Sequence, residues 1–206
     1  MSAVELSLKV LLAAALPISV GTMLLAEPIV RLVAGDAYVP HSVVALQILI
    51  WFLPFSFVNS LLQYVLIAVD QQRFITRSFV LAAVFNVSGN LLLIPHLAYV
   101  GAALTTIGSE LVLLGPFWYA VQRHVGPVRL LALAWRPTLA ALAMGLVTWG
   151  LASWPTLVTV AASAAVYVAV FAAIGGIGPE ERAILRRMLH AHASGEIADR
   201  PPSAGT

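Results

Sequence analysis

The sequence contains no cysteine, which excludes disulfide bonds and thiolate metal ligands. Charged side chains are scarce too: they make up 10% of the 206 residues, against about 25% in a typical soluble domain. Recognisable catalytic motifs are also missing. The sequence has no phosphate-binding loop, no HExxH or GxSxG segment, and no pair of acidic residues with enzyme-like spacing. We therefore expect no enzyme, and no bound metal or cofactor.

Most of the sequence is apolar: 61% of the residues are hydrophobic, and they form long uncharged runs. The segments 10–26, 42–69, 78–109 and 137–179 contain no Asp, Glu, Lys or Arg. A membrane-spanning helix needs about 20 mostly apolar residues. We therefore predict an all-α, polytopic membrane protein whose residues 1–178 form a six-helix transmembrane bundle. Its spans are expected at about 8–26, 41–69, 74–94, 97–121, 130–151 and 156–177.

Prolines and glycines mark breaks in this pattern. Pro54 predicts a kink in the long second span, and Pro95 predicts the end of the third. A short amphipathic helix is expected near 28–34, ended by Gly35. Residues 179–192 are expected to form an amphipathic helix on the cytoplasmic membrane surface, and the small polar tail 193–206 is expected to be disordered.

The basic residues predict the orientation of the six spans. Of the 11 Lys and Arg residues, all but Arg31 fall in one alternating set of loops and termini. Because cytoplasmic loops are enriched in Lys and Arg, both termini are predicted to be cytoplasmic. The pI of 9.3 could also suggest nucleic-acid binding, but the basic residues are spread between apolar runs, and membrane orientation explains this spread better. No nucleic-acid partner is therefore expected.

Glu110 is the only charged residue between Arg77 and Arg123. An acidic side chain at the centre of a bilayer costs about 2.5–3.5 kcal/mol on insertion scales, so such residues usually face a bundle interior or a wet cavity. Counted from Leu97, Glu110 lies about 20 Å along its helix, which predicts a position in the inner half of the membrane. Arg73 or Arg77 could approach it there.

Other polar residues recur at a spacing of four, which stacks them on one helix face. Asn59 and Gln63 form one such pair, and Asn86 and Asn90 form another. These faces predict either a hydrophilic translocation path or close helix packing. Packing is favoured for the small residues Gly101, Ala102, Ala103, Thr105 and Ser109, whereas both interpretations stay open for the asparagines. The candidate path residues are Glu110, Asn86, Asn90, Asn59 and Gln63.

The order of several motifs resembles a known family. The motifs are GDAY at 35–38, LIAVDQQ at 66–72, NVSGNLLLIP at 86–95 and YVGAA at 99–103, followed by Glu110. From about Lys9 to Arg123 the chain resembles the C-terminal half of Wzx-like oligosaccharide flippases. These belong to the multidrug/oligosaccharidyl-lipid/polysaccharide exporter superfamily. The motifs do not separate a flippase from related exporters.

The resemblance implies a two-lobe transporter in the bacterial cytoplasmic membrane that flips lipid-linked oligosaccharide by alternating access. The matching spans are the later ones of such exporters, so we expect a fragment or truncated form that needs the missing N-terminal lobe or a second chain. Its expected partners are that lobe, the lipid-linked oligosaccharide and membrane lipids. Two alternatives are an ion-coupled multidrug-type antiporter lobe, with Glu110 as a proton or sodium site, and a non-transporting scaffold of a glycan-assembly complex.

Overall fold

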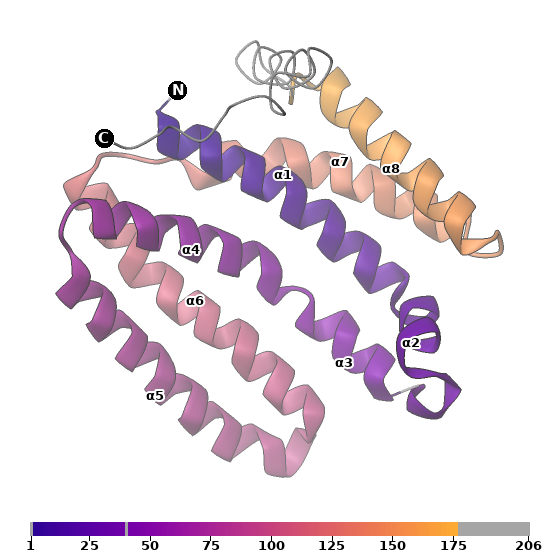
Figure 1. Cartoon of the computed structure of the whole chain (residues 1–206), viewed down its shortest axis with the longest axis horizontal. Helices are drawn as coiled ribbons and strands as arrows, with labels where there is room; N and C mark the ends of the chain where they lie inside the picture. The colour runs from indigo at the N-terminus through magenta and orange to yellow at the C-terminus, as the bar shows by residue number, and fades with distance from the viewer. Residues whose placement is uncertain (1, 40, 177–206) are drawn as a thin grey trace, which may run out of the picture.

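The computed structural model describes residues 2–39 and 41–176 (Figure 1). Within these ranges six helical stretches are long and apolar enough to cross a membrane, and all regular structure is helical, as predicted. The elements are α1 (Ala3–Leu24), α2 (Ala26–Ala34), the 3-10 turn η1 (Asp36–Tyr38), α3 (His41–Leu49), α4 (Phe52–Ala68), α5 (Gln72–Leu97), α6 (Tyr99–His124), α7 (Leu130–Gly150) and α8 (Thr156–Ala173). The segments predicted at 179–192 and 193–206 lie outside the described residues.

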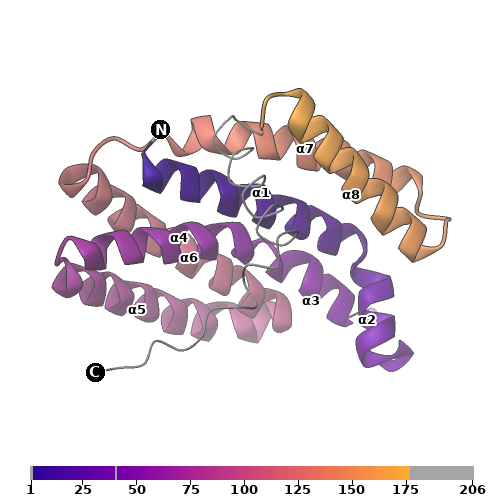
Figure 2. The same cartoon turned by 45° about the horizontal axis from the view of Figure 1, so that its top comes forward.

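The long helices lie side by side in the order α5, α6, α4, α1, α7, α8 (Figures 1 and 2). α3 continues the line of α4, and the short α2 lies across the end of the bundle beside α3. This order differs from the order along the chain, because α1 packs between α4 and α7. Helix α6 is therefore the element that connects the edge helix α5 to α4.

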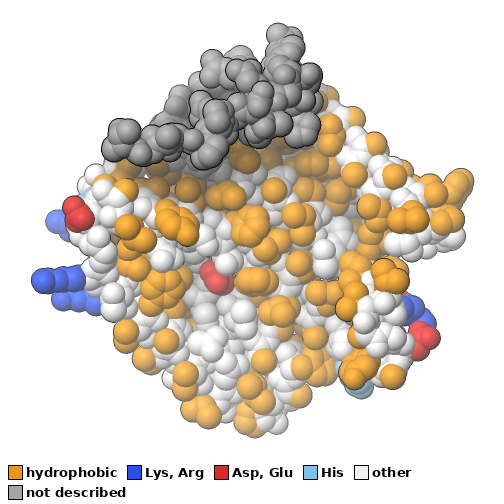
Figure 3. Space-filling view, viewed as in Figure 1, with side chains coloured by type: hydrophobic (Ala, Val, Ile, Leu, Met, Phe, Trp, Pro, Cys, Tyr) orange, Lys and Arg blue, Asp and Glu red, His pale blue; other side chains and the backbone are white. Residues whose placement is uncertain are grey.

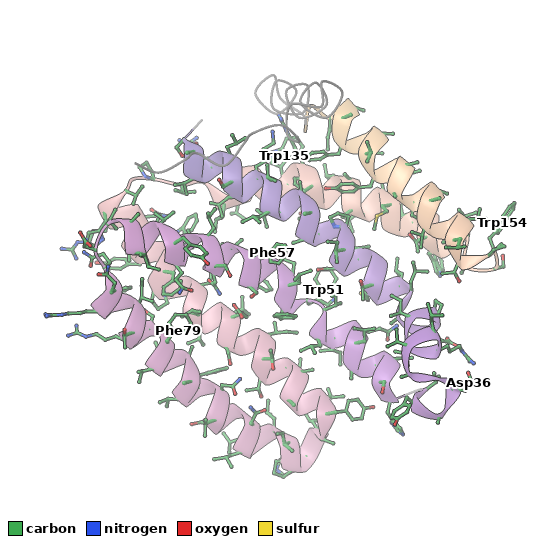
Figure 4. All side chains as sticks on the ribbon, viewed as in Figure 1. Asp36, Trp51, Phe57, Phe79, Trp135 and Trp154 are labelled. Atoms are coloured by element: carbon green, nitrogen blue, oxygen red, sulfur yellow. The ribbon has the colours of Figure 1, made fainter. Side chains whose placement is uncertain are left out.

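The largest group of buried side chains joins α1, α4 and α6. Leu8 and Leu12 of α1 meet Leu62 and Leu66 of α4 and Phe117 of α6. Phe79 of α5 extends the group, since its ring lies edge-on to that of Phe117 with the centroids 5.7 Å apart (Figure 4). Edge-to-face aromatic pairs of this kind contribute about 0.5–1.5 kcal/mol beyond the burial of their area. A smaller buried cluster joins α7 and α8 through Ala140, Ala141, Met144 and Tyr167.

The first helix begins at Ala3, five residues earlier than the predicted span. Ser2 and Glu5 form a capping box: the Glu5 amide donates to the Ser2 hydroxyl at 3.2 Å, and the Ser2 amide donates to the Glu5 carboxylate at 3.0 Å. The box satisfies two amides that the first turn otherwise leaves unpaired. A polar cap thus extends the helix beyond its apolar run.

The second predicted span is divided into α3 and α4, and the break lies at Ile50 and Trp51, just before Pro54. Proline has no N–H, so the Ile50 carbonyl four residues earlier loses its helical donor. The Leu53 amide donates to that carbonyl at 3.1 Å, and the buried Ser19 hydroxyl of α1 donates to it at 3.3 Å. A side chain of the neighbouring helix therefore helps to stabilise the kink that the sequence predicted.

Pro95 does not end the third span, which corrects one prediction: α5 continues through Leu97. Pro95 has no N–H and leaves the Leu91 carbonyl without its helical donor, but only His96 and Leu97 follow it in the helix. Ala98 alone separates α5 from α6, with φ at 48°, and its amide donates to the Ile94 carbonyl at 2.8 Å. The two helices thus form a hairpin with a very tight turn.

Charged side chains gather at the two ends of the bundle (Figure 3). Basic side chains cluster at the end where α4 meets α5, and a smaller group of basic and acidic side chains lies near α2 at the other end. Helix α2 occupies the region predicted to be a short amphipathic helix, and Gly35, at φ 86°, terminates it. Which end faces the cytoplasm remains a prediction from the loop charges.

Candidate functional site

Asn59 of α4 and Glu110 of α6 form the central polar contact of the bundle. Asn59 is 3% exposed, and its Nδ2 donates to Glu110 Oε2 at 2.7 Å. The same amide nitrogen donates to the backbone carbonyl of Glu110 at 2.9 Å. Glu110 is half-buried, and Figure 3 shows one patch of acidic atoms over α4 and α6, away from the edges of the bundle. The contact joins the two helices near the middle of α6.

The two acceptors determine how the Asn59 amide is oriented. A carbonyl and a carboxylate oxygen both accept hydrogen bonds, so the nitrogen of the amide faces Glu110. Asn59 Oδ1 then points elsewhere, and it is buried without a hydrogen-bond partner in the described part of the chain. An unpaired buried oxygen of this kind costs about 1–3 kcal/mol. The side chain thus stabilises Glu110 while its own acceptor remains unsatisfied.

A second polar group links α5 to the adjacent side of α6. Asn90 Nδ2 donates to Asn86 Oδ1 at 2.9 Å, and Asn86 Nδ2 donates to Ser109 Oγ at 2.9 Å. Ser109 in turn donates to the Thr105 carbonyl at 2.8 Å. Because Ser109 directly precedes Glu110, the two polar groups meet on α6. Asn90 Oδ1 is a second buried oxygen without a partner among the described residues.

Glycines allow α5 and α6 to approach closely around this group. A Cβ added to Gly89 would lie 2.7 Å from the Thr105 methyl group, and one added to Gly101 would lie 2.7 Å from the backbone of Leu93. Thr105 itself is 2% exposed and donates to the Gly101 carbonyl at 2.8 Å. Gly89, Gly101 and Thr105 serve helix packing here, and the sequence favoured this interpretation for Gly101 and Thr105.

The asparagines of α5 also face open space. A groove of about 370 Å³ is lined by Asn86, Asn90 and the neighbouring residues Val87, Leu91, Ile94 and Pro95, all on α5. The groove lies on the outer edge of the hairpin, since α5 packs mainly against α6. The two asparagines therefore both connect helices and line an accessible surface.

The structure places the five predicted path residues as follows. Asn59 and Glu110 are in direct contact, and Asn86 and Asn90 are in contact with each other and with α6. Gln63 joins neither group, and it forms no hydrogen bond within the described ranges. The sequence missed the partnership between Asn59 and Glu110 because residues 51 positions apart carry no local signal.

One expectation about Glu110 differs from the structure. In residues 2–39 and 41–176 it forms no ion pair with Arg73 or Arg77; its neutral partner is Asn59. Helix α6, which carries Glu110, runs from Tyr99 to His124. At 1.5 Å per residue, Glu110 lies about 17 Å from the first residue and about 21 Å from the last. It therefore lies near the middle of its helix, and its depth in the membrane stays a prediction.

Comparisons with known proteins agree with this architecture. The MatE family model matches residues 1–92, which is less than half of the chain. A solved structure titled lipid II flippase MurJ, inward closed conformation, matches 83% of the chain with a TM-score of 0.73 and 18% sequence identity. The chain has the fold of part of MurJ. The match covers 38% of the length of that protein, and no curated protein matches by sequence.

These findings support the predicted fold class, an all-helical chain with six candidate membrane spans. The part of the chain that matches the MatE model ends at residue 92, so it includes Asn59, Asn86 and Asn90 but not Glu110. At 18% identity the likeness to MurJ concerns the fold alone. The specific resemblance to Wzx-like flippases and the choice of substrate remain proposals.

Proposed function

We propose that this chain forms one lobe of a flippase that moves lipid-linked oligosaccharide across the cytoplasmic membrane for polysaccharide biosynthesis. The observation that carries the proposal is a hydrogen-bonded group of polar side chains within the membrane-length helices, which we call the polar file: Asn59, Glu110, Ser109, Asn86 and Asn90. A substrate with a polar glycan head needs hydrogen-bonding groups at this depth, where lipid tails offer none. The exporter fold supports the same proposal.

The proposed translocation path requires a second surface. The groove at Asn86 and Asn90 lies on an edge helix, and two amide oxygens of the polar file lack partners among the described residues. A facing lobe would enclose the open side of this groove. We therefore propose an N-terminal lobe or a second chain as the partner, because the chain corresponds to only 38% of the length of MurJ.

A reconstituted flipping assay tests the proposal. Proteoliposomes carry a fluorescent lipid-linked oligosaccharide, and dithionite added outside bleaches only the outer leaflet. We expect bleaching to rise well above the protein-free level of about half when this chain is reconstituted with a complementary lobe. Unchanged bleaching with the complete assembly would contradict the proposed function, whereas full activity of the chain alone would contradict the need for a partner.

The position of Glu110 favours one second candidate, an ion-coupled antiporter lobe for amphiphilic cations. A single carboxylate near the middle of a membrane helix is a typical proton or cation site. The variant Glu110→Gln separates the two functions, because the amide retains an acceptor for Asn59 but cannot be ionised. Under antiport, cation-driven dye export is lost in this variant. Glycan flipping without an obligatory proton step persists in it.

A further inference from the structure

A pocket at the end of the bundle opposite the basic cluster has no part in the polar file. Its volume is about 210 Å³, and it lies where α1 ends and α8 begins. The side chains that carry its chemistry are Glu27 of α2, Trp149 near the end of α7, and Trp154 in the turn before α8. Trp149 is 73% and Trp154 is 59% exposed, so both rings are accessible. Figure 4 shows Trp154 at this end of the bundle.

The charges around the pocket leave an excess negative charge. Arg31 donates to Glu27 Oε1 through Nε at 3.1 Å and through Nη2 at 2.8 Å, and its Nη1 pairs with Asp36. The hydrogen bond with Glu27 and the nearby charges raise the pKa of Arg31 above its usual value, so it remains protonated. One positive and two negative groups give this cluster a formal charge of −1. Glu27 Oε2 remains available as an acceptor, because both Arg31 bonds use Oε1.

Two exposed indole rings beside a carboxylate suit a cation. An ammonium group over the face of Trp gains about 0.5–2 kcal/mol by cation–π attraction, and Trp is the best ring for it. The carboxylate and the exposed hydroxyl of Thr156, which also lines the pocket, can accept hydrogen bonds from N–H donors. A primary ammonium provides three such donors, whereas a quaternary ammonium provides none. The pocket thus matches a primary ammonium better.

The level of the pocket indicates where that ammonium comes from. Three membrane-length helices end or begin at it: α1, α7 and α8. Trp side chains concentrate at this level, where the polar headgroups of lipids begin. We propose that the pocket formed by Glu27, Trp149, Trp154 and Thr156 binds the ammonium headgroup of an ethanolamine phospholipid. This site is separate from the proposed translocation path.

Native mass spectrometry of the full chain in detergent tests the proposal. The protein is titrated with phosphatidylethanolamine, phosphatidylcholine and phosphatidylglycerol of identical acyl chains. We expect the ethanolamine lipid to bind about fivefold to tenfold more tightly than the other two, because the glycerol lipid has no cation for the Trp rings and the choline lipid has no N–H donor for the Glu27 carboxylate. Glu27→Gln should remove most of the preference over both lipids. Trp154→Leu should remove most of the preference over phosphatidylglycerol, and Trp154→Phe should retain part of it.

Asp36→Asn provides the matched control. It removes one negative charge from the same Arg31 cluster, but Asp36 does not line the pocket. Circular dichroism of each variant establishes that the helices are intact, and Trp154→Leu tests the pocket without changing any charge. The preference should survive in Asp36→Asn.

Four results would overturn the proposal. Equal binding of the three lipids would contradict the site itself. Equal binding of phosphatidylcholine and phosphatidylethanolamine would contradict the choice of a primary ammonium. An equal loss of the lipid preference in Asp36→Asn and Glu27→Gln would show that the preference depends on the total charge at this end of the bundle and not on Glu27 in the pocket. Finally, soluble glycerophosphoethanolamine that binds as tightly as the lipid would contradict a membrane source for the ligand.

Discussion

Replacement of Asn59 by Leu tests whether the contact with Glu110 holds α4 and α6 together. The substitution keeps a side chain of similar size but removes both hydrogen bonds to Glu110, at 2.7 and 2.9 Å. It also removes the buried Oδ1 that has no partner among the described residues. The two effects on the free energy of unfolding therefore have opposite signs.

The size of each effect can be estimated from the structure. A hydrogen bond to a charged group contributes about 1.5–3 kcal/mol in soluble proteins, and an interhelical hydrogen bond in a membrane contributes about 0.6 kcal/mol on average. Together they stabilise the contact by roughly 2–3.5 kcal/mol, and removal of the unpaired oxygen returns about 1–3 kcal/mol. We expect Asn59→Leu to lower the free energy of unfolding by about 1 kcal/mol.

Unfolding of the detergent-solubilised protein by SDS, followed by circular dichroism, measures this difference. Gln63→Leu is the matched control, because Gln63 lies one turn along the same helix and forms no hydrogen bond in the described part of the chain; its effect should stay within about 0.5 kcal/mol. A double-mutant cycle with Glu110→Leu should give a coupling of about 0.5–2 kcal/mol. A coupling of zero, with Asn59→Leu as stable as the unmodified chain, would refute the reasoning.

Two further substitutions test the packing of the helices. Gly101→Ala should destabilise the protein by about 1–3 kcal/mol, because the new Cβ would lie 2.7 Å from the Leu93 backbone. Gly115→Ala is the control in the same SDS titration: a Cβ there meets no atom within 4 Å, so this variant should not be destabilised. Similar losses of stability in both variants would contradict the close approach of α5 and α6. Ser19→Ala should cost about 0.5–1.5 kcal/mol, because the Ile50 carbonyl at the kink loses its side-chain donor. A variant as stable as the original would show that the hydroxyl does not support the kink.

The sequence predicts the fold class well because membrane spans have a strong local signal. Uncharged runs of sufficient length identified all six helical stretches, and Pro54 predicted the break between α3 and α4. Helix ends were less predictable, since they depend on single interactions. The capping box at Ser2 extends α1 before its apolar run, and the α5–α6 turn at Ala98 lies three residues beyond Pro95.

The site was predicted as a set of residues but not as a set of contacts. Spacing correctly placed Asn86 and Asn90 on one face of a helix, where they are hydrogen-bonded. The partner of Glu110 depended instead on α4 packing beside α6, which no local pattern specifies. An acidic residue among apolar ones suggested a basic partner by charge alone, whereas the nearest donor in the structure is the amide of Asn59.

Labelling of introduced cysteines tests most directly whether the polar file lines a water-accessible path. The chain has no native cysteine, so Asn86→Cys, Asn90→Cys and Leu92→Cys each provide a single thiol. Maleimides react with the thiolate, which requires water. In membranes, we expect a membrane-impermeant maleimide to label the thiols at 86 and 90 but not the thiol at 92, which lies on the opposite side of α5. Equal protection of all three positions would show that the asparagines are packed against other helices or lipid, and it would contradict the proposed path.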